Sequence, residues 1–144
     1  MPPFELDDPL AHRALQALVR AEAAVRRRLA AELEREGVSA AGFSALVVLT
    51  TAGGSLELKI LRRRLGWSKA NATEVTATLS GRGLVARRRD PRDRRAVAID
   101  LTAAGRALVE RLFPDHADRV SRAFRALSDG EKRSLAALCR KLAA

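Results

Sequence analysis

The sequence of 144 residues is short of aromatic and sulfur-containing side chains: it has no tyrosine, one tryptophan, four phenylalanines and one cysteine. A single cysteine, Cys139, excludes a disulfide within the chain and fits a reducing compartment, so we expect a cytoplasmic protein. With so few aromatic side chains the core must be aliphatic and rich in alanine, and this composition favours helices. We expect Cys139 to be a small hydrophobic residue of that core.

The chain also lacks the features of membrane proteins and enzymes. Its start, MPPFELDDPL, has no basic region or apolar stretch, so no signal peptide is expected, and glycines and polar residues interrupt the longest uncharged stretch. His12 and His116 are expected at the surface or an interface; with one cysteine they are too few for a structural zinc site, unless a dimer shares it. No nucleophile–base pair, glycine-rich phosphate loop or paired acidic motif supports catalysis, so we expect no enzyme and no cofactor.

Positive charge is present in excess and is concentrated in the middle of the chain. There are 27 Lys and Arg against 17 Asp and Glu, a formal net charge of +10. Residues 55–101 hold 12 of the cations and 5 of the anions, a net of +7, whereas the other 97 residues carry only +3. A concentrated basic surface suggests an anionic partner, with nucleic acid first and an acidic membrane surface second.

Hydrophobic periodicity and capping signals predict six helices and one hairpin. Ser39, Ser68 and Thr102 are expected N-caps, and Ser128 with Glu131 forms a capping box. Pro114 is expected to kink the fifth helix or split it in two. The predicted helices cover residues 9–36, 40–51, 57–65, 69–80, 103–126 and 129–142, and the predicted strands cover 84–89 and 96–101.

This order of elements predicts a mainly α, α+β winged-helix fold in one domain. Two short helices and a basic hairpin make a winged helix-turn-helix, in which the second helix enters the major groove of DNA and the hairpin loop reaches a neighbouring minor groove. Amphipathic helices at both ends flank this basic middle. Each part has an alternative interpretation when it is considered alone: the second helix could be an ordinary solvated helix face, and the hairpin loop an ordinary solvated charged loop.

The predicted helix over 69–80 is the candidate for reading DNA sequence. Its expected apolar stripe is Ala72, Val75 and Leu79, and Thr76 is placed on another face with Lys69, Thr73 and Ser80. Lys69 can bind guanine or phosphate. Thr73 can donate to a base edge or contact a thymine methyl, and Glu74 can accept a hydrogen bond from cytosine N4. Of Arg62 to Arg64 in the preceding helix, one or two can reach phosphate. The candidate DNA-binding residues here are Ser68, Lys69, Ala70, Asn71, Thr73 and Glu74.

The second candidate surface is the loop within RRRDPRDRR, residues 87–95, which holds six arginines, two aspartates and one proline. Arginine stays charged and is weakly hydrated, so it suits the narrow, electronegative minor groove. We expect Arg94 and Arg95 to enter that groove, Asp93 to brace an arginine by a salt bridge, and Arg92 to share the surface. Arg87 to Arg89 alternate in direction along a strand, so not all three face one DNA backbone.

Residues 90–110, DPRDRRAVAIDLTAAGRALVE, resemble the wing and following helix of MarR-type regulators, whose pattern is roughly D-P-x-D-R-R, alternating apolar residues, then L-T-x-x-G. Ser68 to Gly83 resemble the recognition helix of the family, and FPDHADRV with LSDGEKRSLAALCRKL its dimerisation helices. The resemblance implies a homodimeric transcription factor that binds double-stranded DNA at a pseudo-palindromic operator. Residues 1–37 and 103–144 would hold the dimerisation helices, and 38–102 the DNA-binding lobe.

The resemblance further implies regulation by a small molecule. Many members are repressors released by phenolic or other lipophilic ligands, bound between the dimer helices and the DNA-binding lobe. We therefore expect a ligand-responsive repressor, with an effector pocket beside the second helix lined by Phe43 and Val47 and joined by Arg20, Trp67 and His116. Trp67, Asn71 and Glu74 depart from the family pattern, which affects the expected operator sequence rather than the fold.

Two other classes of protein stay open on the sequence alone. One is a basic protein that coats nucleic acid without sequence preference, and comparing specific with random duplex separates it from a regulator. The other is an enzyme or partner-binding module that merely carries a basic hairpin. A dimer that ignores DNA at low salt would favour that class. No membrane partner is expected in the preferred interpretation.

Overall fold

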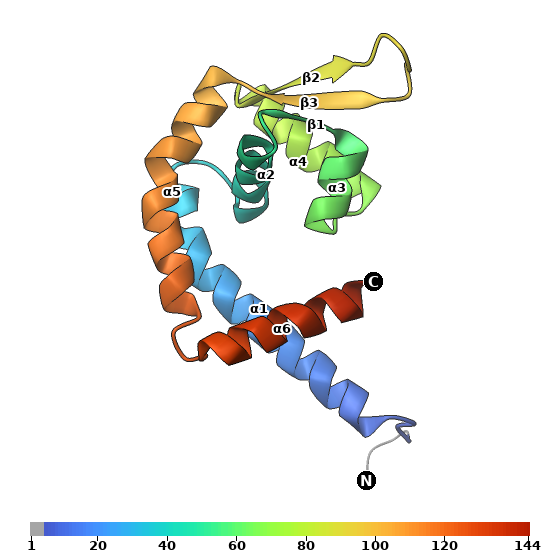
Figure 1. Cartoon of the computed structure of the whole chain (residues 1–144), viewed down its shortest axis with the longest axis vertical. Helices are drawn as coiled ribbons and strands as arrows, with labels where there is room; N and C mark the ends of the chain where they lie inside the picture. Colours follow the sequence, from blue (N-terminus) through green and yellow to red (C-terminus); the bar gives the residue numbers. More distant parts are fainter. Residues whose placement is uncertain (1–4) are drawn as a thin grey trace.

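The computed structural model describes residues 5–144, which form six helices and a three-stranded sheet (Figure 1). In chain order the elements are α1 (Pro9–Arg35), α2 (Ala40–Thr51), β1 (Ser55–Glu57), α3 (Leu58–Leu65), α4 (Lys69–Gly81), β2 (Val85–Arg89), β3 (Val97–Leu101), α5 (Ala103–Ala123) and α6 (Asp129–Ala143). The predicted mainly helical winged-helix fold is confirmed. The first four residues, where no signal peptide is expected, lie outside this description.

Helix α2 forms the centre of the hydrophobic core because it is apolar around most of its circumference. Its side chains Phe43, Leu46 and Leu49 are fully buried, and it packs against α1, α3, α4, α5 and the sheet. Ser39 caps the helix by accepting a hydrogen bond from the Gly42 amide at 2.9 Å. Burying a large apolar side chain contributes roughly 1.5–3 kcal/mol. Helix α2 is therefore the element against which α3, α4 and the sheet pack.

The antiparallel sheet has the strand order β1-β3-β2, and the edge strand β1 is not among the predicted elements. β1 pairs with β3 from Ser55↔Asp100 to Glu57↔Ala98. Three residues are too few to show an alternating pattern, and the strand forms because Gly53 and Gly54 turn the chain with φ values of 89° and 102°. The sheet covers one end of the lobe, and the β2–β3 loop projects beyond it (Figure 1).

Helix α5 runs without interruption through Pro114, so the proline does not split it. Proline removes one amide donor, but packing on both sides of it keeps the helix intact. Before the proline, Leu108 and Leu112 are buried beside α1 and α2, and after it Arg119 forms an ion pair with Glu32 of α1. The helix ends at Ala123, three residues before the predicted end.

The start of α5 is joined to the segment that follows α4. Thr102 Oγ1 accepts a hydrogen bond from the Gly105 amide at 3.1 Å and donates one to the Gly83 carbonyl at 2.7 Å. Gly105 lies so close to the chain that an added Cβ would meet the Leu84 carbonyl oxygen. The helix leading out of the lobe is thus attached directly to the turn between α4 and β2.

The first half of α1 and all of α6 contribute no buried side chain to the protomer. Their large apolar residues, exposed by 39–72%, are Leu10, Leu15, Leu18, Val19, Leu135, Leu138 and Leu142. Cys139 is exposed as well, so the prediction that it belongs to the core is wrong for the protomer, because α6 is not part of that core. Among residues 5–144, no helix combines the length and apolar character needed to cross a membrane.

Candidate DNA interface

Helix α4 begins directly after Ser68, whose Oγ accepts a hydrogen bond from the Asn71 amide at 3.1 Å. The buried face of the helix consists of Ala72, Thr76 and Leu79, with Val75 half-buried. The prediction that placed Thr76 on a different face from the apolar stripe is therefore wrong. The Thr76 hydroxyl donates to the Ala72 carbonyl at 2.7 Å, and this internal bond allows a threonine in a fully buried position.

The five candidate residues within α4 are all exposed: Lys69, Ala70, Asn71, Thr73 and Glu74. The Thr73 hydroxyl donates to the Lys69 carbonyl at 3.0 Å, so it presents an acceptor and a methyl group outward. The Ser68 hydroxyl is likewise engaged by the helix cap. The candidates on α4 lie on two different flanks of the helix, and each flank borders its own groove.

One flank of α4 faces the hairpin across a groove of about 550 Å³, called the wing groove here. Its charged lining residues are Lys59 and Arg62 of α3, Lys69 of α4 and Arg95 of the loop, together with Glu57 and Asp93; Thr73 also lines it. Sequence reasoning missed Lys59. Its spacing of three from Arg62 puts both on one face of α3, and this is the signal that could have found it. Four cations and two anions make the groove positive.

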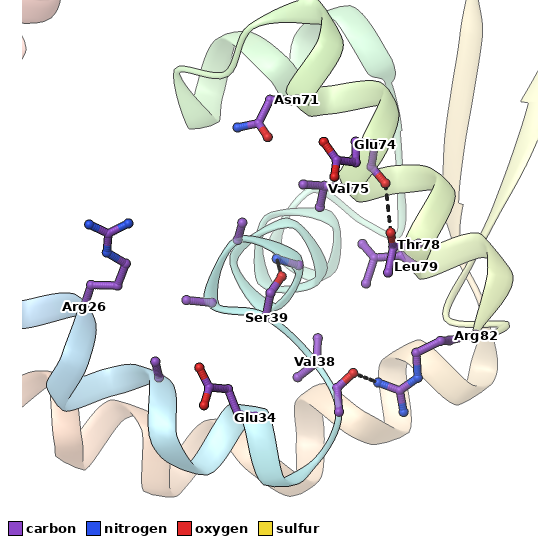
Figure 2. A pocket seen from close by; sticks show the side chains of 15 residues that line it. Arg26, Glu34, Val38, Ser39, Asn71, Glu74, Val75, Thr78, Leu79 and Arg82 are labelled. Carbon is purple, nitrogen blue, oxygen red and sulfur yellow. Dashed lines mark hydrogen bonds between the residues drawn. The ribbon is translucent and has the colours of Figure 1, made fainter. Parts of the chain in front are cut away.

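The opposite flank of α4 borders a second groove, called the α1–α4 groove here, of about 670 Å³ (Figure 2). Asn71 and Glu74 line it, so these two candidates do not share the wing groove with Lys69 and Thr73. On the α4 side it is also lined by Val75, Thr78, Leu79 and Arg82, and across from them by residues of α1, the α1–α2 connection and the start of α2, including Arg26, Glu34, Val38 and Ser39. Helix α4 therefore lies between these two grooves, one on the side of α1 and one on the side of the wing.

The loop between β2 and β3 is shaped by its two aspartates. Asp90 Oδ1 accepts a hydrogen bond from the Arg92 amide at 2.9 Å, and Asp93 Oδ1 accepts one from the Arg95 amide at 3.0 Å. An aspartate readily reaches the amide two residues further on, so Asp93 braces the loop through the backbone rather than through the expected salt bridge. All five residues from Pro91 to Arg95 are exposed, and among them Arg92, Arg94 and Arg95 carry the positive charge of the loop.

The three strand arginines have different environments, as their alternation predicts. Arg88 forms an ion pair with Asp100 of β3 at 3.0 Å, and Ser55 of β1 donates to the same carboxylate at 2.6 Å. These hydrogen bonds, that of Arg88 first, lower the pKa of the Asp100 carboxyl, and they connect all three strands. Arg89 Nη1 donates to the Arg94 carbonyl at 2.8 Å and so holds the loop from the strand side. Arg87 is exposed.

Of the residues expected to line an effector pocket, Phe43 and His116 lie in contact, whereas Arg20 lies away from the core. Phe43 of α2 and His116 of α5 meet edge to face, with ring centroids 4.9 Å apart. His116 Nδ1 is buried without a hydrogen-bond partner in residues 5–144, and burial lowers the pKa of the imidazole. Val47 and Trp67 are half-buried against the core, whereas Arg20 lies on the exposed part of α1. The Phe43–His116 contact is therefore the centre of this region within one protomer.

A helix with an exposed polar face, supported by a second short helix and flanked by a cationic hairpin, defines a winged helix-turn-helix DNA-binding protein. The model of the MarR family matches residues 38–97. An uncharacterized HTH-type transcriptional regulator of Bacillus subtilis, YkoM, is 33% identical over 75% of this chain and 70% of its own length. The chain belongs to the MarR family of transcriptional regulators.

Solved structures have the same fold. Sco3205, a MarR family regulator of Streptomyces coelicolor in complex with DNA, has a TM-score of 0.84 and 24% identity, covering 99% of this chain and 90% of that one. BpsR of Bordetella bronchiseptica, whose DNA binding is regulated by 6-hydroxynicotinic acid, has a TM-score of 0.73 and 28% identity, with coverage of 95% and 100%. The protein is accordingly a DNA-binding transcriptional regulator.

Proposed function

We propose that this regulator binds a pseudo-palindromic DNA site as a homodimer, with the start of α4 in the major groove and the wing loop at the neighbouring minor groove. The wing groove is the observation that carries the proposal. It brings Lys59, Arg62 and Lys69 together with Arg95, from two helices and the loop. A phosphate backbone that passes between a helix in one groove and a loop in the next runs along such a row of cations.

The residues of α4 have different tasks in this arrangement. Lys69 and Thr73, on the wing side, contact phosphate, guanine or a thymine methyl. On the other flank, Asn71 contacts bases from the opposite side, and Glu74 accepts a hydrogen bond from cytosine N4. Ala70, with its small side chain, allows the first turn to approach the bases closely. The amides at the helix start favour phosphate, and the loop arginines Arg92, Arg94 and Arg95 favour the minor groove.

The exposed apolar stripes of α1 and α6 support a dimer. Monomeric soluble proteins rarely expose contiguous apolar surface of this kind, so a second copy of the chain is the proposed cover for the leucines of both helices. Residues 1–37 and 103–144 then form the dimer scaffold, and 38–102 form the DNA-binding lobe. Two lobes related by twofold symmetry place their α4 helices about one DNA turn, roughly 10 bp, apart.

A small molecule is the proposed effector, and repression is the proposed outcome of DNA binding. The support is the region around Phe43 and His116, where a buried imidazole nitrogen is free to bind a polar group of a ligand. The likeness to BpsR supports the same idea. The protein acts by binding rather than by catalysis, and its place is the cytoplasm, where DNA and effector meet.

Selection of genomic fragments by the purified protein tests the proposal. A regulator retains fragments that share a pseudo-palindromic consensus, and binds them at least about 1,000-fold more tightly than random duplex at physiological salt. Equal affinity for both kinds of DNA would instead indicate a protein that coats nucleic acid without preference.

The wing is tested by replacing its arginines. The double variant Arg94→Ala/Arg95→Ala should bind the selected site at least about tenfold more weakly, with an unchanged melting temperature and dimer. The matched control is Arg133→Ala/Arg140→Ala, which removes the same charge from the side of α6 opposite its leucines. Affinity should then stay near that of the wild type. If both double variants lose affinity equally, net charge rather than the wing is responsible.

A further inference from the structure

Arg82, which follows the last residue of α4, bonds to the far end of a different helix (Figure 2). Its Nη1 donates to the Gly37 carbonyl, and its Nη2 donates to the Glu36 carbonyl at 3.3 Å. Both carbonyls lie just after the end of α1. We call this pair of bonds the Arg82 clasp.

The chemistry of the clasp favours arginine. The Glu36 and Gly37 carbonyls follow the last turn of α1, next to the negative end of the helix dipole, which favours a positive charge. A guanidinium group presents several donors in a rigid plane and is always charged, so it can bond to two neighbouring carbonyls at once. Bonds with a charged donor are stronger than neutral ones.

Gly37 leaves the space that the Arg82 guanidinium occupies. Its φ of 71° is one that glycine adopts readily, and it turns the chain from α1 toward α2. A Cβ added there would lie 3.1 Å from Arg82 Nη1 and 3.3 Å from Arg82 Cζ. The absence of a side chain at position 37 therefore allows the Arg82 side chain to lie against the backbone.

The clasp crosses a region where α1 and α4 are otherwise separated by the α1–α4 groove. Helix α4 packs against α2, α3 and β2, whereas α1 packs against α2 and α5. Arg82 and Gly37 both line the groove between the two helices. Tilting of α4 relative to α1 is thus opposed by the clasp at one end of α4.

The same end of α1 is also joined to α5. Arg111 of α5 forms an ion pair with the Glu36 carboxylate at 2.9 Å, and Arg119 pairs with Glu32 one turn earlier. The end of α1 is therefore bonded on one side to Arg111 of α5 and on the other to Arg82 at the end of α4. A change in the orientation of α5 is therefore transmitted to α4 through Glu36 and Gly37.

We propose that Arg82 is a positioning residue that sets the orientation of α4 relative to the dimer scaffold, and thereby sets the distance between DNA half-sites that the dimer accepts. This rests on the proposed function, since the distance has meaning only for a dimer on a two-part site. Arg82 acts on DNA through helix orientation rather than by contacting phosphate.

The experiment uses a set of duplexes carrying the selected site with its half-sites at the native spacing, and one or two base pairs closer or further apart, plus a duplex with one half-site. Arg82→Ala should lower the affinity for the native spacing about tenfold and flatten the preference among spacings. Its affinity for the single half-site should change less than twofold. Arg82→Lys, which keeps the charge but has a single donor nitrogen in place of the planar guanidinium, should restore part of the spacing preference.

The outcomes separate the two proposals. An unchanged spacing profile for Arg82→Ala overturns the role of Arg82, as does an equal loss on the single half-site, which would indicate a phosphate contact. Wild-type protein with no preference for two half-sites would instead overturn the proposed dimeric function. Arg133→Ala is the control for loss of one charge.

A second measurement does not require DNA. Spin labels at Ala77→Cys, in a Cys139→Ser background, report the distance between the two reading helices of the dimer. The distance distribution should broaden when Arg82 is replaced by alanine or, if that variant does not fold, by lysine. An equally narrow distribution overturns the proposal.

Discussion

At Gly105 the first turn of α5 has no room for a side chain. An added Cβ would meet the Leu84 carbonyl oxygen and lie 2.8 Å from Leu101 Cδ1, and the backbone cannot move away without shifting α5. We expect Gly105→Ala to lower the free energy of unfolding by roughly 1–3 kcal/mol, measured by urea denaturation. Gly81→Ala is the control, since open space surrounds it; it should gain up to about 1 kcal/mol. Equal stability of both variants would contradict the close approach.

His116 should make the stability of the protein depend on pH. Burial lowers the pKa of the folded imidazole below its ordinary value of 6.5, so the unfolded chain takes up a proton first as the pH falls. The stability contribution is complete above that value and is lost as the pH falls through the folded pKa. His116→Phe keeps an aromatic ring against Phe43 and should reduce this loss.

Urea unfolding at about pH 7.5 and about pH 5 measures the effect, because the two conditions lie on either side of the ordinary imidazole pKa. The wild type should lose more stability between them than His116→Phe does. His12→Gln, a change at an exposed histidine of α1, should behave like the wild type. An identical loss in all three proteins would show that His116 does not control this pH range.

At the scale of elements, local signals were sufficient for most of the helices. Ser39, Ser68, Thr102 and Ser128 each accept the capping hydrogen bond expected from the sequence, and each predicted helix start lies within one residue of the observed one. Caps involve residues three apart, so a sequence displays them directly. The α6 capping box is likewise present.

Contacts between distant segments could not be predicted in the same way. Strand β1 exists only through its pairing with β3, and Lys59 joins the candidate site only because α3 lies near Arg95 of the loop. The buried position of Thr76 depends on the rotation of α4 against α2, which a polar hydroxyl obscures in the sequence. Asp93 can bond either to a backbone amide or to a neighbouring arginine side chain, and the sequence alone does not distinguish the two.

Helix α6 gives a test of capping at this scale. Ser128→Ala removes the hydroxyl that accepts a hydrogen bond from the Glu131 amide at 3.2 Å, which is one of the two bonds of the capping box. We expect a loss of about 1 kcal/mol in the stability of α6. Since α6 buries nothing in the protomer, the loss should weaken the proposed dimer about fivefold in sedimentation equilibrium. Ser121→Ala, an exposed position inside α5, should leave the dimer unchanged.

At the scale of the whole molecule, DNA binding should depend on the dimer. Leu138→Glu places a carboxylate in the exposed leucine stripe of α6, where burial against a second chain would desolvate it. We expect a monomer in sedimentation equilibrium and at least a hundredfold weaker binding of the palindromic site, since one lobe holds only half of it. Ala136→Glu adds the same charge on the other side of α6 and should remain dimeric. A dimeric Leu138→Glu protein would exclude this stripe from the interface.

The aspartate-to-backbone bonds of the wing loop also affect the thermodynamics and speed of recognition. Ordering a flexible residue costs roughly 1–2 kcal/mol of conformational entropy, and here that cost falls on folding rather than on DNA binding. The loop meets DNA as a preformed shape, so electrostatic attraction rather than a search among loop conformations governs the association rate. A regulator that samples a long chromosome gains from this, because each brief encounter with a wrong sequence can end without any refolding of the loop.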